Sequence, residues 1–287
     1  MSLWVDFRDN KFGERYRLID LRGKSALVTG ASAGIGEAIA RVLAREVGTL
    51  VLVARRRERL DAIAADLKKD RANLRVIVRA CDLVHRAATA VMFDALEKDG
   101  VVIDILINNA GFGDRGLFEG ADWKKIESLL ELNVVSATFV LRRLLPGMVA
   151  RRFGAVLNVG STAGIVPSPE SATYAASKAY LNHLNEAVRA ELSGTGVSLT
   201  ALLPGPVPTE FQAVAGGMLR PAIPRPFWVD AATCAEEAIR ALKRGDARVV
   251  PGLAPRLAAL AVEATPKAFL RPLLARVGRG LRNRKKQ

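Results

Sequence analysis

The sequence predicts a single doubly wound α/β domain, with about seven parallel strands and helices on both faces. Short strand-like runs alternate with longer helical stretches along most of the chain. The runs are apolar throughout, as expected for strands that helices cover on both sides. The 287 residues are half hydrophobic and contain no Ser- or Gly-rich linker, so we expect one large core.

The strand-like runs give the order of the elements. The first run is 25–29, and a glycine-rich turn and a helical pattern over 37–43 follow it. Further runs lie at 50–54, 74–80, 103–107, 155–159 and 197–202. Because helical stretches separate these runs, we expect βαβ units and a parallel sheet.

The turn after the first run has the composition of a phosphate-binding loop. Gly30, Gly34 and Gly36 follow Thr29 with the spacing G-x-x-x-G-x-G, which differs from the general G-x-G-x-x-G fingerprint. Glycines permit a tight turn and close approach of a pyrophosphate, and the start of the next helix offers free N–H groups and a partial positive charge. We therefore expect a dinucleotide to bind here.

Tyr174 and Lys178 place a phenol and an ammonium four residues apart, on one face of a predicted helix. The ammonium would stabilise the phenolate and draw the phenol pKa, about 10 when unperturbed, toward neutrality. Ser161 follows an apolar run, at the strand edge where open α/β sheets bind ligands. Its hydroxyl could donate to a substrate oxygen shared with Tyr174. The alternative is a serine that only forms a turn.

Several motifs in order resemble the short-chain dehydrogenase/reductase family, in its classical branch. They are Thr29-Gly30 with Gly34 and Gly36, Asn108-Asn109-Ala110-Gly111, the tetrad of Asn133, Ser161, Tyr174 and Lys178, and Pro204-Gly205 with Thr209. The resemblance covers about residues 23–211. It implies a Rossmann-type fold with a seven-stranded sheet whose last strand is 247–250.

The resemblance also implies a reaction, which is reversible hydride transfer between a nicotinamide and a carbonyl or carbinol carbon. Tyr174 would exchange the proton, Ser161 would orient the oxygen, and Lys178 would bind the nicotinamide ribose. Asn133 would hold a water that links Lys178 to solvent. The cofactor contacts that the resemblance implies are Gly30, Ser32, Gly34, Ile35, Gly36, Asp82, Leu83, Asn109, Ala110, Gly111, Tyr174, Lys178, Pro204, Gly205, Val207 and Thr209, with Asp82 at the adenine.

The end of the second predicted strand favours NADP over NAD. Ala54 and Arg55 stand where NAD-binding sites usually place an acid. A guanidinium binds a 2′-phosphate through charge-assisted contacts, whereas a carboxylate would repel it. Ala33 occupies a loop position that is often basic in NADP-dependent members of the family, which weakens the preference. The alternative is that Arg55, Arg56 and Arg57 only form the solvated start of a helix.

Residues 206–229 correspond to the substrate lid of the resembled family. This segment contains the apolar side chains Phe211, Met218, Leu219, Phe227 and Trp228, and Gly216-Gly217 offers a hinge. We expect a hydrophobic ketone, aldehyde or acyl substrate. The same side chains could instead pack against the body of the fold.

The formal net charge is +14, and much of the excess lies in a C-terminal extension at 253–287. Apolar residues recur there with helical spacing, and Thr265 before Pro266 resembles an N-cap and first turn. We expect a basic amphipathic helix. It could pack on the core or a neighbouring subunit, lie on an anionic membrane surface, or bind an acidic carrier protein or thioester. Nucleic acid is the least favoured partner, because no recognition module accompanies the charge.

Other features limit the remaining possibilities. Cys81 and Cys234 are isolated, as are His85 and His183, so we expect reduced thiols and no metal site. No apolar run reaches the roughly 20 residues of a membrane span, and we find no signal peptide, so we expect a cytoplasmic protein. Residues 1–22 form an N-terminal extension of unassigned role before a catalytic domain at 23–252. We expect a homodimer or homotetramer. A catalytically silent cofactor sensor or scaffold is the alternative to an enzyme.

Overall fold

A parallel sheet with the strand order β3-β2-β1-β4-β5-β6-β7 organises the computed structural model, which describes residues 18–216 and 223–284. Its strands are β1 Ser25–Thr29, β2 Thr49–Ala54, β3 Arg75–Ala80, β4 Ile105–Asn108, β5 Gly154–Val159, β6 Val197–Leu202 and β7 Arg248–Val249. All seven predicted strands are therefore confirmed. The seventh has two residues rather than the expected four, and it pairs with β6 alone at the edge of the sheet.

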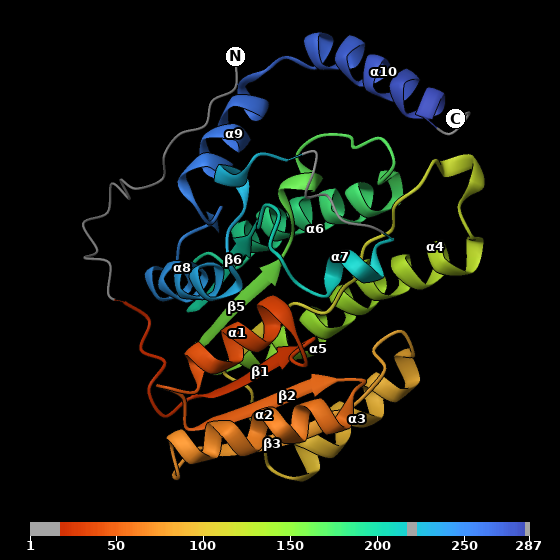
Figure 1. Ribbon diagram of the computed structural model, residues 1–287. Helices are drawn as coiled ribbons and strands as arrows, with labels where there is room; N and C mark the ends of the chain where they lie inside the picture. The colour runs from red at the N-terminus through yellow and green to blue at the C-terminus, as the bar shows by residue number, and fades with distance from the viewer. Residues whose placement is uncertain (1–17, 217–222, 285–287) are drawn as a thin grey trace.

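Helices connect the strands and continue beyond the sheet. The α-helices are α1 Gly34–Leu43, α2 Arg57–Asp70, α3 Arg86–Lys98, α4 Trp123–Leu130, α5 Ala137–Ala150, α6 Ala172–Glu191, α7 Phe211–Val214, α8 Ala231–Arg244, α9 Leu253–Ala264 and α10 Lys267–Arg284. The shorter helical turns are η1 Phe118–Gly120, η2 Glu131–Ser136, η3 Thr162–Gly164 and η4 Arg225–Phe227. Helices cover both faces of the sheet, so the predicted doubly wound fold is confirmed (Figure 1).

The strands bury both of their faces because successive side chains point to opposite sides. Ala26 and Val28 join the cluster that contains α1, α2 and α8, whereas Leu27 joins the cluster that contains α3 and α5. The edge strand β3 is the exception to the fully apolar pattern. Its residues are exposed or half-buried, because it has a neighbour on one side only.

The chain reverses its direction of winding at β1. This strand pairs with β2 on one side and with β4 on the other, and all pairings are parallel. The carboxyl ends of β1 and β4 therefore form a topological switch point, where doubly wound sheets bind ligands. Thr29 ends β1, and Asn108 ends β4.

The helical run from Trp123 to Ala150 is the described segment whose length and mean hydropathy of 1.2 would fit a membrane span. Its apolar side chains nevertheless contribute to the interior. Ile126, Leu129, Val140 and Met148 are buried. The run therefore packs on the α/β domain through these side chains, although only 33% of its apolar stretch is buried.

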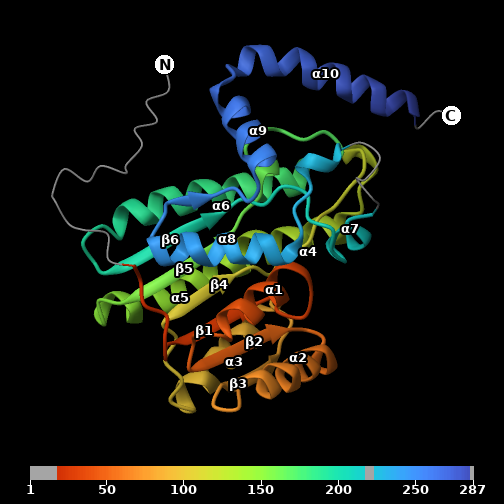
Figure 2. The same cartoon turned by 60° about the vertical axis from the view of Figure 1, so that its left-hand side comes forward.

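The C-terminal extension forms two helices rather than one. Pro255 and Ala259 are buried where α9 meets the body of the fold, while α10 extends away from the sheet in both views (Figure 2). The expectation that Thr265 caps the last helix is wrong. α10 begins at Lys267, and the Thr265 hydroxyl donates to the Ala261 carbonyl at 2.7 Å, so Thr265 terminates α9.

Candidate active site

The glycine-rich turn packs directly against the end of β4. Gly30 has a φ of +66°, which favours glycine, and a side chain there would meet the Asn109 amide at 2.7 Å. A side chain at Gly36 would collide with the Gly30 carbonyl and the Asn109 amide. The Asn109 side chain donates to the Thr29 carbonyl at 2.9 Å, and the Ala110 N–H donates to the Thr29 hydroxyl at 3.0 Å. The structure therefore brings these predicted residues together.

The helix α1 begins beside this turn without a side-chain cap. Ala33 is extended at the N-cap position and supplies no hydrogen-bonding side chain. N–H groups in the first turn of a helix have no intrahelical partner, so an anion placed there would satisfy them. Thr209 reaches the same place from the loop after β6, because a side chain at Gly34 would lie 3.1 Å from the Thr209 methyl group.

Several of the other predicted cofactor contacts already bond or pack against other parts of the protein. The Val207 carbonyl accepts from the Gln212 side chain at 3.2 Å, and the Pro204 carbonyl accepts from the Thr162 N–H at 3.1 Å. Leu83 is buried in the core, and Ile35 packs against the core on the α1 side. Gly205 faces α9, where a side chain would meet Pro255 at 3.3 Å. The Leu83 side chain therefore offers little surface to a ligand, whereas that of Ile35 is half-buried.

Ser161, Tyr174 and Lys178 converge just beyond the carboxyl end of β5. The Ser161 hydroxyl lies near enough to the Tyr174 phenol to lower its pKa, and it accepts a hydrogen bond from the Ala163 N–H at 3.0 Å. The Lys178 ammonium donates to the Val159 carbonyl at 2.8 Å and lies 6.0 Å from the centre of the Tyr174 ring. Close packing of α6 against η3 permits this arrangement, since a side chain at Gly164 would strike the α6 backbone at 2.6 Å.

Asn133 lies in the π-helical turn η2 and is fully buried. Such turns interrupt the regular hydrogen-bond ladder and often occur at functional sites. Its side-chain amide donates to the Phe112 carbonyl at 2.9 Å and accepts from the Phe112 N–H at 3.1 Å. It also donates to the Ser177 hydroxyl at 3.1 Å. Protein groups thus engage the amide, so a water bound at Asn133 would have to use the backbone carbonyl.

Burial controls the protonation of Tyr174 and Lys178. It raises the pKa of the Tyr174 phenol, while the nearby Ser161 hydroxyl lowers it. It also lowers the pKa of Lys178 to about 8. The net direction for Tyr174 is opposite to the sequence-based expectation. Because the Lys178 ammonium is bonded to Val159 and lies 6.0 Å from the ring centre, desolvation outweighs its charge.

An aromatic side chain from the predicted lid contacts the catalytic candidate directly. The rings of Phe211 and Tyr174 have centres 5.5 Å apart and planes tilted by 57°. The segment 206–229 leaves and rejoins the body at one place, since the Val229 N–H donates to the Pro206 carbonyl at 3.2 Å. The predicted lid residues Met218 and Leu219, and Gly217 of the proposed hinge, lie outside the described residues.

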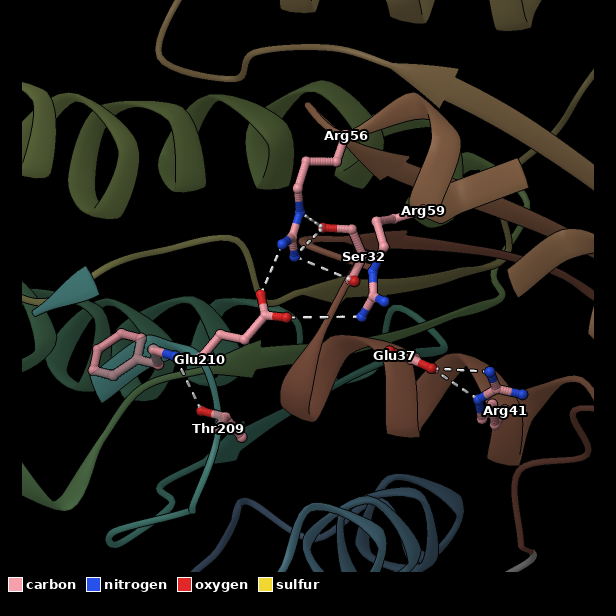
Figure 3. Close-up of polar contacts among 8 residues, drawn as sticks. Ser32, Glu37, Arg41, Arg56, Arg59, Thr209 and Glu210 are labelled. Carbon is pink, nitrogen blue, oxygen red and sulfur yellow. Dashed lines mark hydrogen bonds and ion pairs between the residues drawn. The ribbon is translucent and has the colours of Figure 1, made fainter. Parts of the chain in front are cut away.

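Arg56, rather than Arg55, reaches the glycine-rich turn (Figure 3). Its guanidinium donates to the Ser32 hydroxyl at 3.1 Å and to Glu210 at 2.7 Å. Arg59 lies 3.7 Å from the other oxygen of Glu210. Arg55 instead approaches Asp82, at 4.0 Å, and its side chain is 73% exposed. Sequence reasoning assigned the phosphate contact to Arg55 and missed Arg56, Arg59 and Glu210.

Two other groups of residues lie apart from this site. Cys81 and Cys234 are buried free thiols, and burial raises the pKa of Cys234 to about 12. Within residues 18–216 and 223–284, no three His, Cys, Asp or Glu side chains cluster to hold a metal ion. A surface hollow of about 360 Å³ lies between α8, β7 and α9, where Arg244 and Arg248 contact Asp246 and Glu263.

The switch point, the uncapped helix start and the Ser161–Tyr174–Lys178 cluster all lie at the carboxyl edge of one parallel sheet. This arrangement is typical of doubly wound α/β proteins that bind dinucleotides. The family model described as short chain dehydrogenase matches residues 24–218, and the chain belongs to that family.

Three known proteins illustrate this relationship. A short chain dehydrogenase from Pseudocercospora fijiensis (strain CIRAD86) is 36% identical over 198 residues, which are 67% of this chain but only 62% of that protein. This chain thus spans less than two thirds of that relative. A short-chain dehydrogenase from Sphingobium yanoikuyae in complex with NADPH has a TM-score of 0.75 and 32% identity, over 88% of this chain and 95% of that one. A bulky-bulky ketone specific alcohol dehydrogenase from Comamonas testosteroni has a TM-score of 0.70 and 27% identity, over 89% and 92%.

Proposed function

We propose that this protein is an NADP-dependent oxidoreductase that interconverts an apolar carbonyl compound and its alcohol. The observation that carries the proposal is the convergence of Ser161 and Tyr174 beside Lys178, whose buried ammonium is fixed at the Val159 carbonyl and lies 6.0 Å from the centre of the Tyr174 ring. A carbonyl oxygen placed between the two hydroxyls would receive two hydrogen bonds. Such donors stabilise the negative charge that develops on oxygen when the carbon is reduced.

Each side chain of the cluster would have a separate role in the reduction. Bound NADPH would supply the hydride that the carbonyl carbon accepts. Tyr174 would donate its proton to the carbonyl oxygen, and Ser161 would hold that oxygen in place. Lys178, fixed at the Val159 carbonyl, would bind a ribose hydroxyl and return a proton toward Tyr174. Asn133 would connect the loop at Phe112 to Ser177 of α6.

The residues at the glycine-rich turn fit a dinucleotide with a 2′-phosphate. The uncapped start of α1 would bind the pyrophosphate, and the tight contacts at Gly30 and Gly36 leave room only for backbone. Arg56 and Ser32 already form a hydrogen-bonded pair beside the turn, with Arg59 near them. Two guanidiniums would bind the 2′-phosphate of NADP, whereas NAD sites typically place a carboxylate at this position. The NADPH complex of the Sphingobium relative supports this preference.

The substrate side of Tyr174 is apolar, which supports a hydrophobic ketone, aldehyde or acyl substrate. Phe211 covers part of the Tyr174 ring. Trp228 is half-buried, and its indole N–H donates to the Ile223 carbonyl at 3.1 Å. The similarity to an enzyme specific for bulky ketones points to the same class. The acyl alternative remains within this proposal.

The remaining proposals concern assembly and location. We infer a catalytic unit at 23–252 that forms homodimers or homotetramers, to which 253–287 is appended. Leu130 of α4, Val135 of η2 and Tyr180 of α6 are exposed and available for a subunit contact. A cytoplasmic location stays a prediction.

The test measures the oxidation of NADPH and of NADH in the presence of apolar ketones, aldehydes and acyl thioesters. The absorbance of the reduced nicotinamide reports the rate. Tyr174→Phe should lower kcat by about 10²–10⁴ while leaving NADPH binding intact, because only the proton donor is lost. Tyr180→Phe is the matched control. Its phenol bonds Thr138 at 3.1 Å on the surface, so its turnover should stay near that of the unaltered protein.

Two results would contradict the proposal. Equal turnover in Tyr174→Phe and the unaltered protein would remove Tyr174 as the proton donor. NADPH binding without Tyr174-dependent turnover of any compound tested would favour the sensor or scaffold alternative.

A further inference from the structure

The helix α10 carries apolar side chains that the described chain leaves uncovered. Phe269, Leu273 and Val277 are 70%, 59% and 44% exposed, and they follow one another at intervals of four residues. Both views place α10 beyond α9 and away from the sheet (Figures 1 and 2). Leu270, Leu274 and Leu281 on the neighbouring side of the helix are half-buried, so only part of the apolar face of α10 is covered.

The side chains of α10 are segregated around the helix axis. At 100° per residue, its bulky apolar side chains fall within an arc of about 140°. They are Phe269, Leu270, Leu273, Leu274, Val277 and Leu281. Arg271 and Arg276 lie on the two sides of this arc, and Arg279 and Arg282 lie opposite it. The position of Arg284, the last residue of the helix, falls within the arc at the C-terminal end. An apolar arc flanked by arginines is the pattern of a helix that lies in a lipid interface, where the long side chains reach the headgroups.

The charge of this region has one sign. Residues 253–287 contain nine basic residues and one acid, so they carry +8 of the net charge of +14. The acid is Glu263, and both of its oxygens are bound by Arg248 at 2.6 Å. Arg282 pairs with Glu119 at 2.9 Å on the surface. Arg271, Arg276 and Arg279 are exposed, and no acidic residue follows Glu263 in the sequence of this segment.

The preceding helix presents a second apolar row. Leu253, Leu257 and Leu260 of α9 are 73%, 57% and 49% exposed. The opposite side of α9 is fixed to the protein, since Ala259 joins a core cluster with Leu203 and Val250. α9 thus anchors α10 to the enzyme and adds apolar surface beside it.

We propose that α10 binds an anionic lipid surface, with the exposed row of Phe269, Leu273 and Val277 in the headgroup region and its arginines on the phosphates. Charge complementarity selects this partner. A second copy of the chain would bring two arginine-rich helices together, which is unfavourable electrostatically. The proposal does not depend on the catalytic assignment.

The experiment is flotation of the full-length protein with phosphatidylcholine vesicles, either pure or containing about 30% phosphatidylglycerol. We expect binding to the anionic vesicles only, and release at high salt. Phe269→Ser/Leu273→Ser/Val277→Ser should weaken binding by about tenfold or more, because three exposed apolar side chains leave the interface. Arg271→Gln/Arg276→Gln/Arg279→Gln should do the same through charge.

The matched control is Val91→Ser/Val102→Ser, which alters two valines that are 67% and 50% exposed outside the C-terminal helices. It should bind vesicles like the unaltered protein. Circular dichroism and NADPH affinity should be equal in all variants, because the altered side chains lie on the surface. These readouts separate membrane binding from folding and from the proposed catalysis.

Three outcomes would overturn the proposal. The first is absence of binding to anionic vesicles at low salt. The second is equal vesicle binding by the serine variant and the control. The third is a dimer that the serine substitutions dissociate while vesicle binding stays absent, which would assign the apolar arc to a second copy.

Discussion

Arg56 donates to Glu210 at 2.7 Å and so connects the start of α2 to the first residues of the lid, 154 residues further along the chain. The same guanidinium donates to Ser32 in the glycine-rich turn. One side chain thus bridges the predicted 2′-phosphate site and the segment that carries Phe211 over Tyr174 (Figure 3). A phosphate bound to Arg56 would compete with the Glu210 carboxylate.

Removal of the Glu210 charge should therefore tighten NADPH binding. Glu210→Gln should lower the Kd of NADPH by about two- to fivefold, the range expected for an exposed ion pair, and leave the Kd of NADH unchanged. Fluorescence titration of the two reduced cofactors measures this. Glu236→Gln is the control, because Glu236 forms a similar exposed pair with Arg45 at 2.6 Å. Equal effects on NADPH and NADH would show that Glu210 does not compete with the phosphate.

Arg56 should contribute more to NADP preference than Arg55. Loss of a charge-assisted phosphate contact in Arg56→Ala should raise the Kd of NADPH by about 10–100-fold, with little change for NADH. Arg55→Ala should have a smaller effect, since Arg55 points toward Asp82.

Arg57→Ala controls for the loss of a charge, because Arg57 faces Asp61 within α2 at 3.5 Å. The ratio of the NADPH and NADH dissociation constants is the readout. A larger change in Arg55→Ala than in Arg56→Ala would return the phosphate contact to Arg55.

Buried Lys178 should make stability depend on pH. Its pKa is about 8 in the folded protein and about 10.4 in an unfolded chain, so between these values the unfolded state binds more protons. Stability therefore rises with pH in this window. Relative to Lys178→Met, the free energy of unfolding should increase by about 2 kcal/mol from pH 8 to pH 10.

Urea unfolding of the two proteins across that range measures the difference. The comparison stays below pH 10 because the raised pKa of Tyr174 has the opposite effect at higher pH. Parallel curves for the two proteins would mean that Lys178 titrates near its ordinary pKa.

Gly36 should not tolerate a side chain. In Gly36→Ala the new methyl group would collide with the Gly30 carbonyl and the Asn109 amide, both of which are fixed by other contacts. We expect a loss of about 1–3 kcal/mol in the free energy of unfolding, typical of overpacking, and weaker binding of both cofactors.

Gly280→Ala is the matched control, since nothing lies within 4 Å of a methyl group at that position in α10. It should be neutral or slightly stabilising, because alanine favours a helix over glycine. Urea unfolding and cofactor titration test both variants. An unchanged Gly36→Ala protein would mean that the turn can move away from Asn109.

The sequence by itself determined the sheet and the identity of the main site residues. Strands such as 50–54 can be predicted from local composition, because a strand that helices cover on both faces needs a continuous apolar stretch. The places of Gly30 and Gly36 in the tight turn can also be predicted, since close approach of the backbone excludes residues with a side chain. Tyr174 and Lys178 could be paired from spacing alone, because four residues place two side chains on one helix face.

Only the tertiary structure decided how distant side chains meet. It placed Arg56 at Ser32 and Arg55 near Asp82, because adjacent residues at a strand end point in different directions. It also paired Glu210 with Arg56, and local sequence patterns cannot predict a contact between residues so far apart in the chain. It set the direction of the Tyr174 pKa through burial, and it left Phe269 exposed on α10. Desolvation and long-range contacts depend on the assembled fold, so the spacing of residues in the sequence could not supply them.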